Sequence, residues 1–174
     1  MPDKIRKKKQ TATVIIIIIL ITVYAHALNF SAKPAEISVQ QSVSVSENVI
    51  TIFERIFGLT ITLSENQFAD FEKAIRKTAH FLEYALIGLL LYLIPLIWNQ
   101  KSIKTAALSF LIVVFLAAID ETLQLFIPGR AGLITDVVID SFGCLTGMLI
   151  IKFIYEKIVS RNSKTKVSRN NFTK

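Results

Sequence analysis

The chain has few of the residues, and none of the motifs, that mark the common reactive sites. It contains one cysteine, Cys144, and two histidines among 174 residues. A lone cysteine has no partner in the chain for a disulfide or a thiolate metal site, so we expect Cys144 to face lipid or to pack. A serine nucleophile elbow, an H-E-x-x-H zinc motif and a glycine-rich phosphate loop are also absent. The sequence therefore predicts no metal site and no cofactor.

Long hydrophobic runs dominate the sequence instead. Hydrophobic residues make up 52% of the chain and the mean hydropathy is +0.53, which leaves little room for a separate water-soluble domain. Four apolar segments each approach the ~20 residues that a helix needs to cross hydrocarbon. They run from Thr11 to Leu28, Ala79 to Trp98, Thr105 to Phe126 and Val137 to Ile154. We predict an all-α integral membrane four-helix bundle.

Charges of opposite sign gather at opposite ends of these segments. Of the 20 Lys and Arg residues, 14 lie at the N-terminus, in the 99–104 loop or beyond Ile151, which four spans place on one side of a membrane. Of the 13 acids, 11 lie in residues 29–77 or at the other ends of the last three spans. By the positive-inside rule the basic side, with both termini, is cytoplasmic. The net charge of +7 then faces anionic lipid headgroups, and no nucleic acid partner is predicted.

This topology divides the chain into five parts. They are a cytoplasmic basic N-terminus (1–10), a first transmembrane helix (11–28), an extracytoplasmic segment (29–76), a three-helix membrane core (77–154) and a cytoplasmic basic tail (155–174). The first span is also similar to a secretory signal, because Ala25-His26-Ala27 fits a cleavage site. Its apolar run continues to Leu28, long enough to span the membrane, so an uncleaved anchor is favoured.

The extracytoplasmic segment begins with polar, serine-rich sequence. Residues 37–45 alternate apolar and polar side chains, which fits a short strand or a linker, and the linker is preferred. An apolar stripe at helical spacing follows and predicts an amphipathic helix on the outer membrane surface, ended by Gly58. The stripe consists of Val49, Ile52, Phe53, Ile56 and Phe57.

A second helix is predicted to open at Ser64, because Ser64 and Gln67 have the spacing of a capping box. This helix continues into the second span. Glu72 and Arg76 lie four residues apart on it and make a favourable pair.

The last three spans carry polar residues near their outer ends. An ionisable side chain at mid-membrane costs at least ~2.5 kcal/mol by insertion scales, so their number requires a reason. Helical periodicity, similar depth and the short 127–132 connection predict that three helices converge on one outward-facing polar cluster that binds a ligand. Its members are Arg76, Lys77, His80, Glu83, Tyr84, Asp120, Glu121, Gln124, Arg130, Asp136 and Asp140.

Alternative interpretations remain open for parts of this cluster. Its acids and bases could neutralise one another and only fix helix packing. Gly143 and Gly147 are predicted to form a close-packing face. His80-x-x-Glu83 alone is a weak metal signal. If the protein is an enzyme, His80, Glu121 and Asp136 are the candidate acid and base groups.

Three segments together resemble the VanZ-like family. They are Arg76-Lys77-Thr78-Ala79-His80-Phe81-Leu82-Glu83-Tyr84-Ala85-Leu86, Asp120-Glu121-Thr122-Leu123-Gln124-Leu125-Phe126-Ile127-Pro128-Gly129-Arg130, and Asp136 through Gly143 to Gly147. The resemblance covers residues 75–151. It carries over the family's polar positions as Lys77, His80, Tyr84, Asp120, Glu121, Gln124, Arg130 and Asp136. Asp140 departs from the pattern, which has Asn there, so it is expected to be protonated or to have a partner such as Arg130 or His80.

The resemblance implies a multi-pass protein of the bacterial plasma membrane. The family's name-giving member confers low-level resistance to the lipoglycopeptide teicoplanin in Gram-positive bacteria. One hypothesis is therefore that the cluster binds an envelope lipid, a cell-wall precursor or the antibiotic, with Arg76, Lys77 and Arg130 contacting phosphate or carboxylate groups. Another is acid-base or metal-assisted chemistry on a lipid headgroup.

A proton-coupled transporter is disfavoured. The inner halves of the second and third spans, residues 89–97 and 106–115, contain almost no polar groups, and neither broken helices nor inverted repeats occur. A continuous path across the bilayer would need another copy or partner, so a homo-oligomer stays open.

Overall fold

The computed structural model describes the backbone of residues 3–172 and the side chains of residues 3–161. Within this range the chain forms five helices and no strand, which confirms the all-α prediction. The helices are α1 (Asp3–Ser31), α2 (Ala35–Phe57), α3 (Glu65–Ile97), α4 (Ile103–Gln124) and α5 (Ile134–Phe172). Among the described residues, four helices are long and apolar enough to cross a membrane: α1, α3, α4 and α5. The predicted basic tail lies partly beyond the described side chains.

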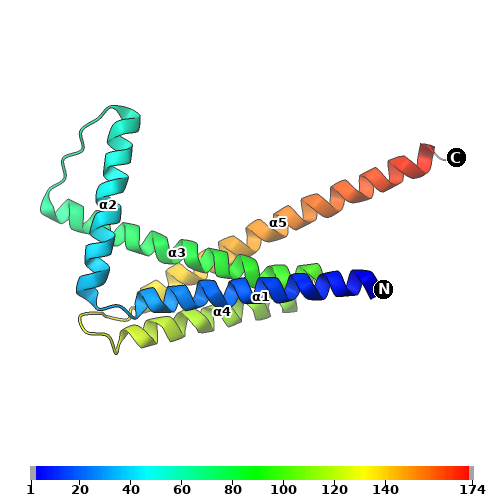
Figure 1. Cartoon of the computed structure of the whole chain (residues 1–174), viewed down its shortest axis with the longest axis horizontal. Helices are drawn as coiled ribbons and strands as arrows, with labels where there is room; N and C mark the ends of the chain where they lie inside the picture. Colours follow the sequence, from blue (N-terminus) through cyan, green and yellow to red (C-terminus); the bar gives the residue numbers. More distant parts are fainter. Residues whose placement is uncertain (1–2, 173–174) are drawn as a thin grey trace.

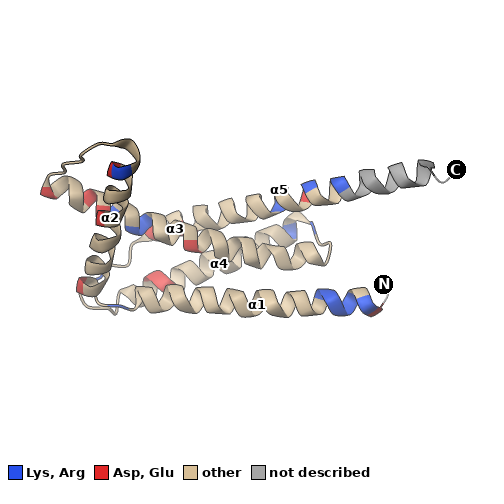
Figure 2. Ribbon diagram, turned by 45° about the horizontal axis from the view of Figure 1, so that its top comes forward, with Lys and Arg blue, Asp and Glu red and all other residues tan. Residues whose placement is uncertain are grey.

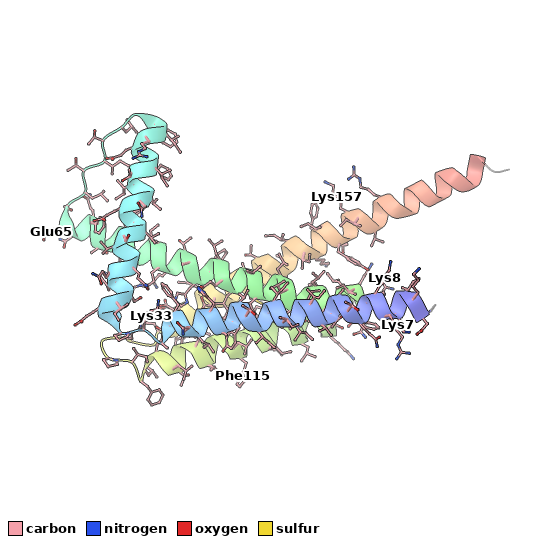
Figure 3. The ribbon with its side chains drawn as sticks, in the orientation of Figure 1. Lys7, Lys8, Lys33, Glu65, Phe115 and Lys157 are labelled. Atoms are coloured by element: carbon pink, nitrogen blue, oxygen red, sulfur yellow. The ribbon has the colours of Figure 1, made fainter. Side chains whose placement is uncertain are left out.

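The four long helices form an elongated bundle with both chain termini at one end (Figure 1). Helix α2 crosses the opposite end of this bundle, which we call the α2 end. Figure 2 shows the basic runs of α1 and α5 at the end that holds the termini, and acidic residues along α2 and the neighbouring parts of α3 and α4. Lys7, Lys8 and Lys157 thus lie far from Glu65, which marks the tip of α3 (Figure 3).

The bundle has a small core and a large apolar exterior. The core lies where α3, α4 and α5 meet, around Tyr84, Ile87, Val113 and Cys144. Cys144 is fully buried, and its Sγ lies 3.7 Å from the Met148 Sδ. Of the two expectations for this residue, lipid contact and packing, the structure shows packing. Exposed leucines, isoleucines and phenylalanines cover the outside, such as Phe115, which points away from the bundle (Figure 3). Such a surface suits lipid contact.

Helices α3 and α5 pack most closely, and glycine makes this approach possible. A Cβ atom at Gly143 would overlap the backbone of Phe81, and one at Gly147 would overlap the backbone of Ala85. On the facing helix, a Cβ at Gly88 would meet the backbone and Sγ of Cys144. Small residues that bring two backbones together are typical of helix contacts in membranes.

The prediction of a linker at residues 37–45 was wrong, and so was the alternative prediction of a strand. This stretch is the first half of α2, which begins at Ala35 rather than near Val49. Its buried face is a serine stripe, Ser38, Ser42 and Ser46, at intervals of four residues. The alternation of apolar and polar residues concealed this helical period, because the helix buries small polar side chains in place of apolar ones.

The two helix boundaries predicted around this region are present. Helix α2 ends at Gly58, which has a positive φ of 64° and donates its N–H to the Glu54 carbonyl. The Ser64 capping box forms: the Ser64 N–H donates to Gln67 Oε1 at 2.9 Å, and the Gln67 N–H donates to Ser64 Oγ at 3.4 Å. Helix α3 then runs without interruption for 33 residues into its apolar part.

Replacing Gly147 with Val should destabilise the protein by about 2 kcal/mol or more, because the added side chain must separate α3 from α5. Thermal unfolding of the purified protein in detergent measures the effect. Leu149→Val is the control, since it places the same side chain on the exposed face of α5, where Leu149 is 57% exposed. Equal melting temperatures for the two variants would contradict the close contact.

Candidate ligand-binding site

A cavity of about 270 Å³ opens at the α2 end of the bundle. Its walls come from the start of α2, one face of α3, the loop between α4 and α5, and the first turns of α5. The backbone N–H of Ala35 donates to the Pro128 carbonyl at 3.3 Å and so fixes the start of α2 against the loop. The polar residues that line the cavity are Lys73, Arg76, Lys77, His80, Gln124, Arg130, Asp136 and Asp140.

Four of these side chains lie on one face of α3. Lys73, Arg76, Lys77 and His80 follow the spacing i, i+3, i+4 and i+7, which aligns them along a helix. Each of the three cations in this row has an acidic neighbour on the protein. Lys77 Nζ lies 2.7 Å from Asp136 Oδ1, Lys73 pairs with Asp70 at 3.5 Å, and Arg76 forms the predicted pair with Glu72 at 3.9 Å.

Arg130 faces this row of cations from the α4–α5 loop. Its Nε donates to the Lys33 carbonyl at 3.1 Å, and one terminal nitrogen donates to the Phe30 carbonyl at 3.3 Å. Burial lowers the pKa of the Arg130 guanidinium from its ordinary value, and the positive charge of Arg76 lowers it further. Two positive charges thus confront each other in a confined space, which favours an anion between them.

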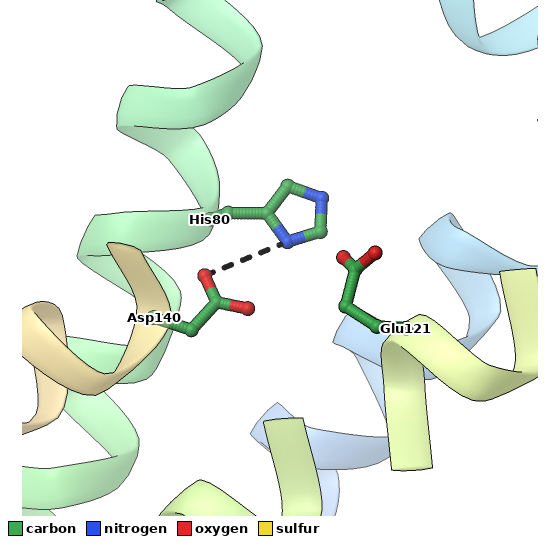
Figure 4. Close-up of side chains that lie close together, drawn as sticks. All are labelled: His80, Glu121 and Asp140. Atoms are coloured by element: carbon green, nitrogen blue, oxygen red, sulfur yellow. Dashed lines mark ion pairs between the residues drawn. The ribbon is translucent and has the colours of Figure 1, made fainter. Parts of the chain in front are cut away.

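Three potential ligand groups meet beneath the cations. One ligand atom each from His80, Glu121 and Asp140 lies within 4.8 Å of the other two, and Figure 4 shows the three side chains pointing toward one another. His80 Nδ1 lies 3.9 Å from Asp140 Oδ1. Arg130, the other partner considered for Asp140, directs its hydrogen bonds to the carbonyls of α1, the neighbouring turn and Gln124.

Glu121 is held in place from two sides. The Gln124 amide donates to Oε1 at 3.0 Å, and the Leu133 backbone N–H donates to Oε2 at 2.9 Å. Asp140 differs, because its side chain is fully buried and neither oxygen accepts a hydrogen bond from the described residues. His80 Nδ1 is likewise buried without a hydrogen bond, and its acidic neighbour is Asp140 at 3.9 Å. Such groups are costly in an apolar interior.

Three of the predicted site residues, Tyr84, Asp120 and Glu83, make their contacts away from the cavity. Tyr84 and Asp120 are fully buried and tie helices together, because the Tyr84 and Ser31 hydroxyls both donate to Asp120 Oδ2, at 3.3 and 3.1 Å. Glu83 lies on another side of α3, where it pairs with His26 at 3.7 Å. Seven of the eleven predicted residues line the cavity, and Glu121 lies close to two of them, His80 and Asp140.

Beside the cavity lies a larger and mainly apolar groove of about 470 Å³ between α1, α2 and α3. Phe30, Val45, Ile75 and Ala79 supply apolar walls, and small polar walls come from α2, namely Ser38, Ser42 and Ser44. Arg76 and His80 line both spaces. A basic cavity and an apolar groove therefore adjoin at these two side chains.

Sequence reasoning missed several residues here. Lys73 had a usable signal, because it shares the helical spacing of Arg76, Lys77 and His80. His26 and Ser31 had none, since their positions depend on how α1 packs against α3 and α4. The buried pairing of Ser42 with Glu72, in which the hydroxyl donates to the carboxylate, likewise required the position of α2.

Fold and site together define a multi-pass helical membrane protein with a polar cluster at one end of its bundle. The chain matches the VanZ/LLP1 family model over residues 14–155, which is most of its length, and it belongs to that family. The match extends beyond the 75–151 resemblance and includes α1 and α2. Comparison with curated proteins and with solved structures gave no significant match.

Tyr84→Phe should lower the free energy of unfolding by about 1–3 kcal/mol, because it removes a donor from the buried Asp120 carboxylate. Denaturant titration of the purified protein, followed by loss of helical signal, measures this. Tyr92→Phe is the matched control on the same helix, since Tyr92 is also buried but makes no hydrogen bond within the described chain. Equal losses in both variants would show that Asp120 gains nothing from the Tyr84 hydroxyl.

Proposed function

We propose that this protein is a VanZ-like component of the bacterial cell envelope that binds the anionic headgroup of an envelope lipid or wall precursor in its outward-facing cavity. The observation that carries the proposal is the meeting of Arg76 and Arg130 across a cavity that adjoins an apolar groove. A charged headgroup and an acyl chain on one molecule fit these two spaces. Teicoplanin also joins an acyl chain to polar groups, so the same site suits a lipoglycopeptide.

The second half of α2 supports a position at the outer membrane surface. Ile52, Phe53, Ile56 and Phe57 are each about half exposed or more, and Leu59 in the following loop is exposed as well. The part of α2 that carries this surface projects away from the bundle (Figure 1), and the first half of the same helix lines the groove. An apolar helix face of this kind lies at the boundary between headgroups and acyl chains, where it would guide a lipid from the outer leaflet into the groove.

A second candidate function is chemistry on the bound headgroup. The meeting of His80 with Glu121 and Asp140 favours it, because an imidazole beside two carboxylates offers an acid and base pair or a metal site. Asp136 fits this role less well than Asp140, since Lys77 already holds it in an ion pair. Our catalytic candidates are therefore His80 and Glu121, with Asp140 in place of Asp136.

Arg76→Gln and Arg130→Gln should each weaken binding of a phosphate-monoester lipid at least fivefold, because each removes a charge-assisted hydrogen bond worth ~1.5–3 kcal/mol. Binding is measured with the purified protein in mixed micelles that contain the lipid and a chelator. Arg55→Gln is the matched control, since Arg55 is exposed on α2 outside both spaces.

Three further outcomes of this binding assay separate the alternatives. Equal binding by all three variants would contradict a headgroup site at the cavity. Competition by inorganic phosphate alone would indicate a phosphate site that does not require the acyl chain. Recovery of a chemically altered lipid from wild type but not from His80→Gln, with binding retained, would favour the enzyme.

Expression of the wild type in a sensitive Gram-positive host should raise resistance to teicoplanin, whereas His80→Gln, Glu121→Gln and Arg130→Ala should not. The reason is that each substitution removes a charged or hydrogen-bonding group from the cavity or the cluster beneath it. Growth inhibition by teicoplanin is the readout, with membrane levels equalised by immunoblot. Resistance equal to empty vector in all strains would contradict the antibiotic function for this chain.

A further inference from the structure

We propose that His80, Glu121 and Asp140 form a binding site for one divalent transition-metal ion, of which Zn²⁺ is the best fit. The proposal rests on the geometry of these three residues and does not depend on lipid binding. An imidazole nitrogen with two carboxylate oxygens is a donor set that such ions accept. The sequence does not indicate this metal site, because the three residues come from α3, α4 and α5 and share no motif.

The distances already approach those of a metal centre. Ligand atoms bonded to a tetrahedral Zn²⁺ at ~2.0–2.2 Å lie about 3.3–3.6 Å apart. His80 Nδ1 and Asp140 Oδ1 lie 3.9 Å apart, and all three ligand atoms lie within 4.8 Å of one another. Side-chain rotations that bring these atoms roughly 1 Å closer together would place all three on one ion.

Asp140 supplies an independent reason to expect a cation. Its side chain is fully buried, and both of its oxygens lack a hydrogen-bond partner although they point into the cluster (Figure 4). A buried carboxylate whose charged neighbour is an imidazole at 3.9 Å, with no hydrogen bond, is poorly compensated. Asp136 and one oxygen of Asp120 each have a donor, from Lys77 and Tyr84, although Asp120 Oδ1 has none. Among these three acids in the described chain, Asp140 is the one for which both oxygens lack a donor.

The surroundings of Glu121 are those of a supported metal ligand. Gln124 and the Leu133 N–H each bond one of its oxygens and fix the orientation of the carboxylate, while each oxygen keeps a further lone pair. Hydrogen bonds of this kind orient ligands around bound metals. Three protein ligands leave a fourth position open, and His80 and Asp140 both line the cavity. If the lipid proposal also holds, a phosphate oxygen is the natural fourth ligand.

The test is calorimetric titration of Zn²⁺ into the chelator-stripped full chain in detergent, purified without a histidine tag. Wild type should bind one Zn²⁺, and His80→Gln, Glu121→Gln and Asp140→Asn should each weaken binding at least tenfold. Asp3→Asn is the matched control, because it makes the same change at an exposed residue of α1 outside the cavity and the triad, and its affinity should stay within threefold of wild type. Equal affinities in Asp140→Asn and Asp3→Asn would overturn the proposal.

A second measurement guards against variants that fail to fold. Pulsed electron paramagnetic resonance of the Co²⁺-loaded wild type should show coupling to an imidazole nitrogen. The chain has only one other histidine, His26, which is far more exposed and pairs with Glu83. His26→Gln should keep the nitrogen coupling. Absence of the coupling in wild type, or its loss in His26→Gln, would overturn the assignment. Neither experiment contains lipid, so its failure leaves the lipid proposal untouched.

Discussion

The close contact between α3 and α5 determines which acids and bases of these two helices meet, and the cavity is built around those pairs. These two helices run in the same direction, and glycine allows their backbones to approach along several turns. Gly143 contacts Phe81 and Gly147 contacts Ala85, which fixes the register of the pair. In this register the preceding turns of α5 place Asp140 beside His80 and Asp136 beside Lys77. A larger side chain in the contact would displace acid and base together.

Once the register is fixed, the free energy of burying charge separates structural groups from functional ones. In an apolar interior a polar atom without a partner costs free energy, and packing alone gives no reason to retain it. Asp120 receives two hydroxyl donors and Asp136 an ammonium, so both stabilise helix contacts. Within the described chain, Asp140 and the His80 Nδ1 atom face each other at 3.9 Å and have no hydrogen bond. The free-energy cost at these two groups is the reason for proposing a ligand there.

The sequence predicts the spans well and the pairings poorly, for a common reason. Hydropathy and capping act within one segment, so the four spans, Gly58 and the Ser64 capping box could be assigned locally. Contacts between helices depend on rotation and register, which local patterns do not contain. The pairing of Glu83 with His26 could therefore not be predicted, although Glu83 and His80 do line one groove. The prediction for the first half of α2 was wrong because the buried face of this segment is serine, and hydropathy detects only apolar faces.

The two proposed ligands would lie close together, because Arg76 and Arg130 line the cavity and His80 and Asp140 belong both to its lining and to the proposed metal site. An anion held by the two arginines alone would be repelled by the carboxylates of Glu121 and Asp140. A divalent cation between those carboxylates would neutralise their charge and offer a bond to the anion. The anion would in turn offset the repulsion between the metal and the two guanidinium groups. Each ligand should therefore strengthen binding of the other by the same factor, because coupling between two sites is reciprocal.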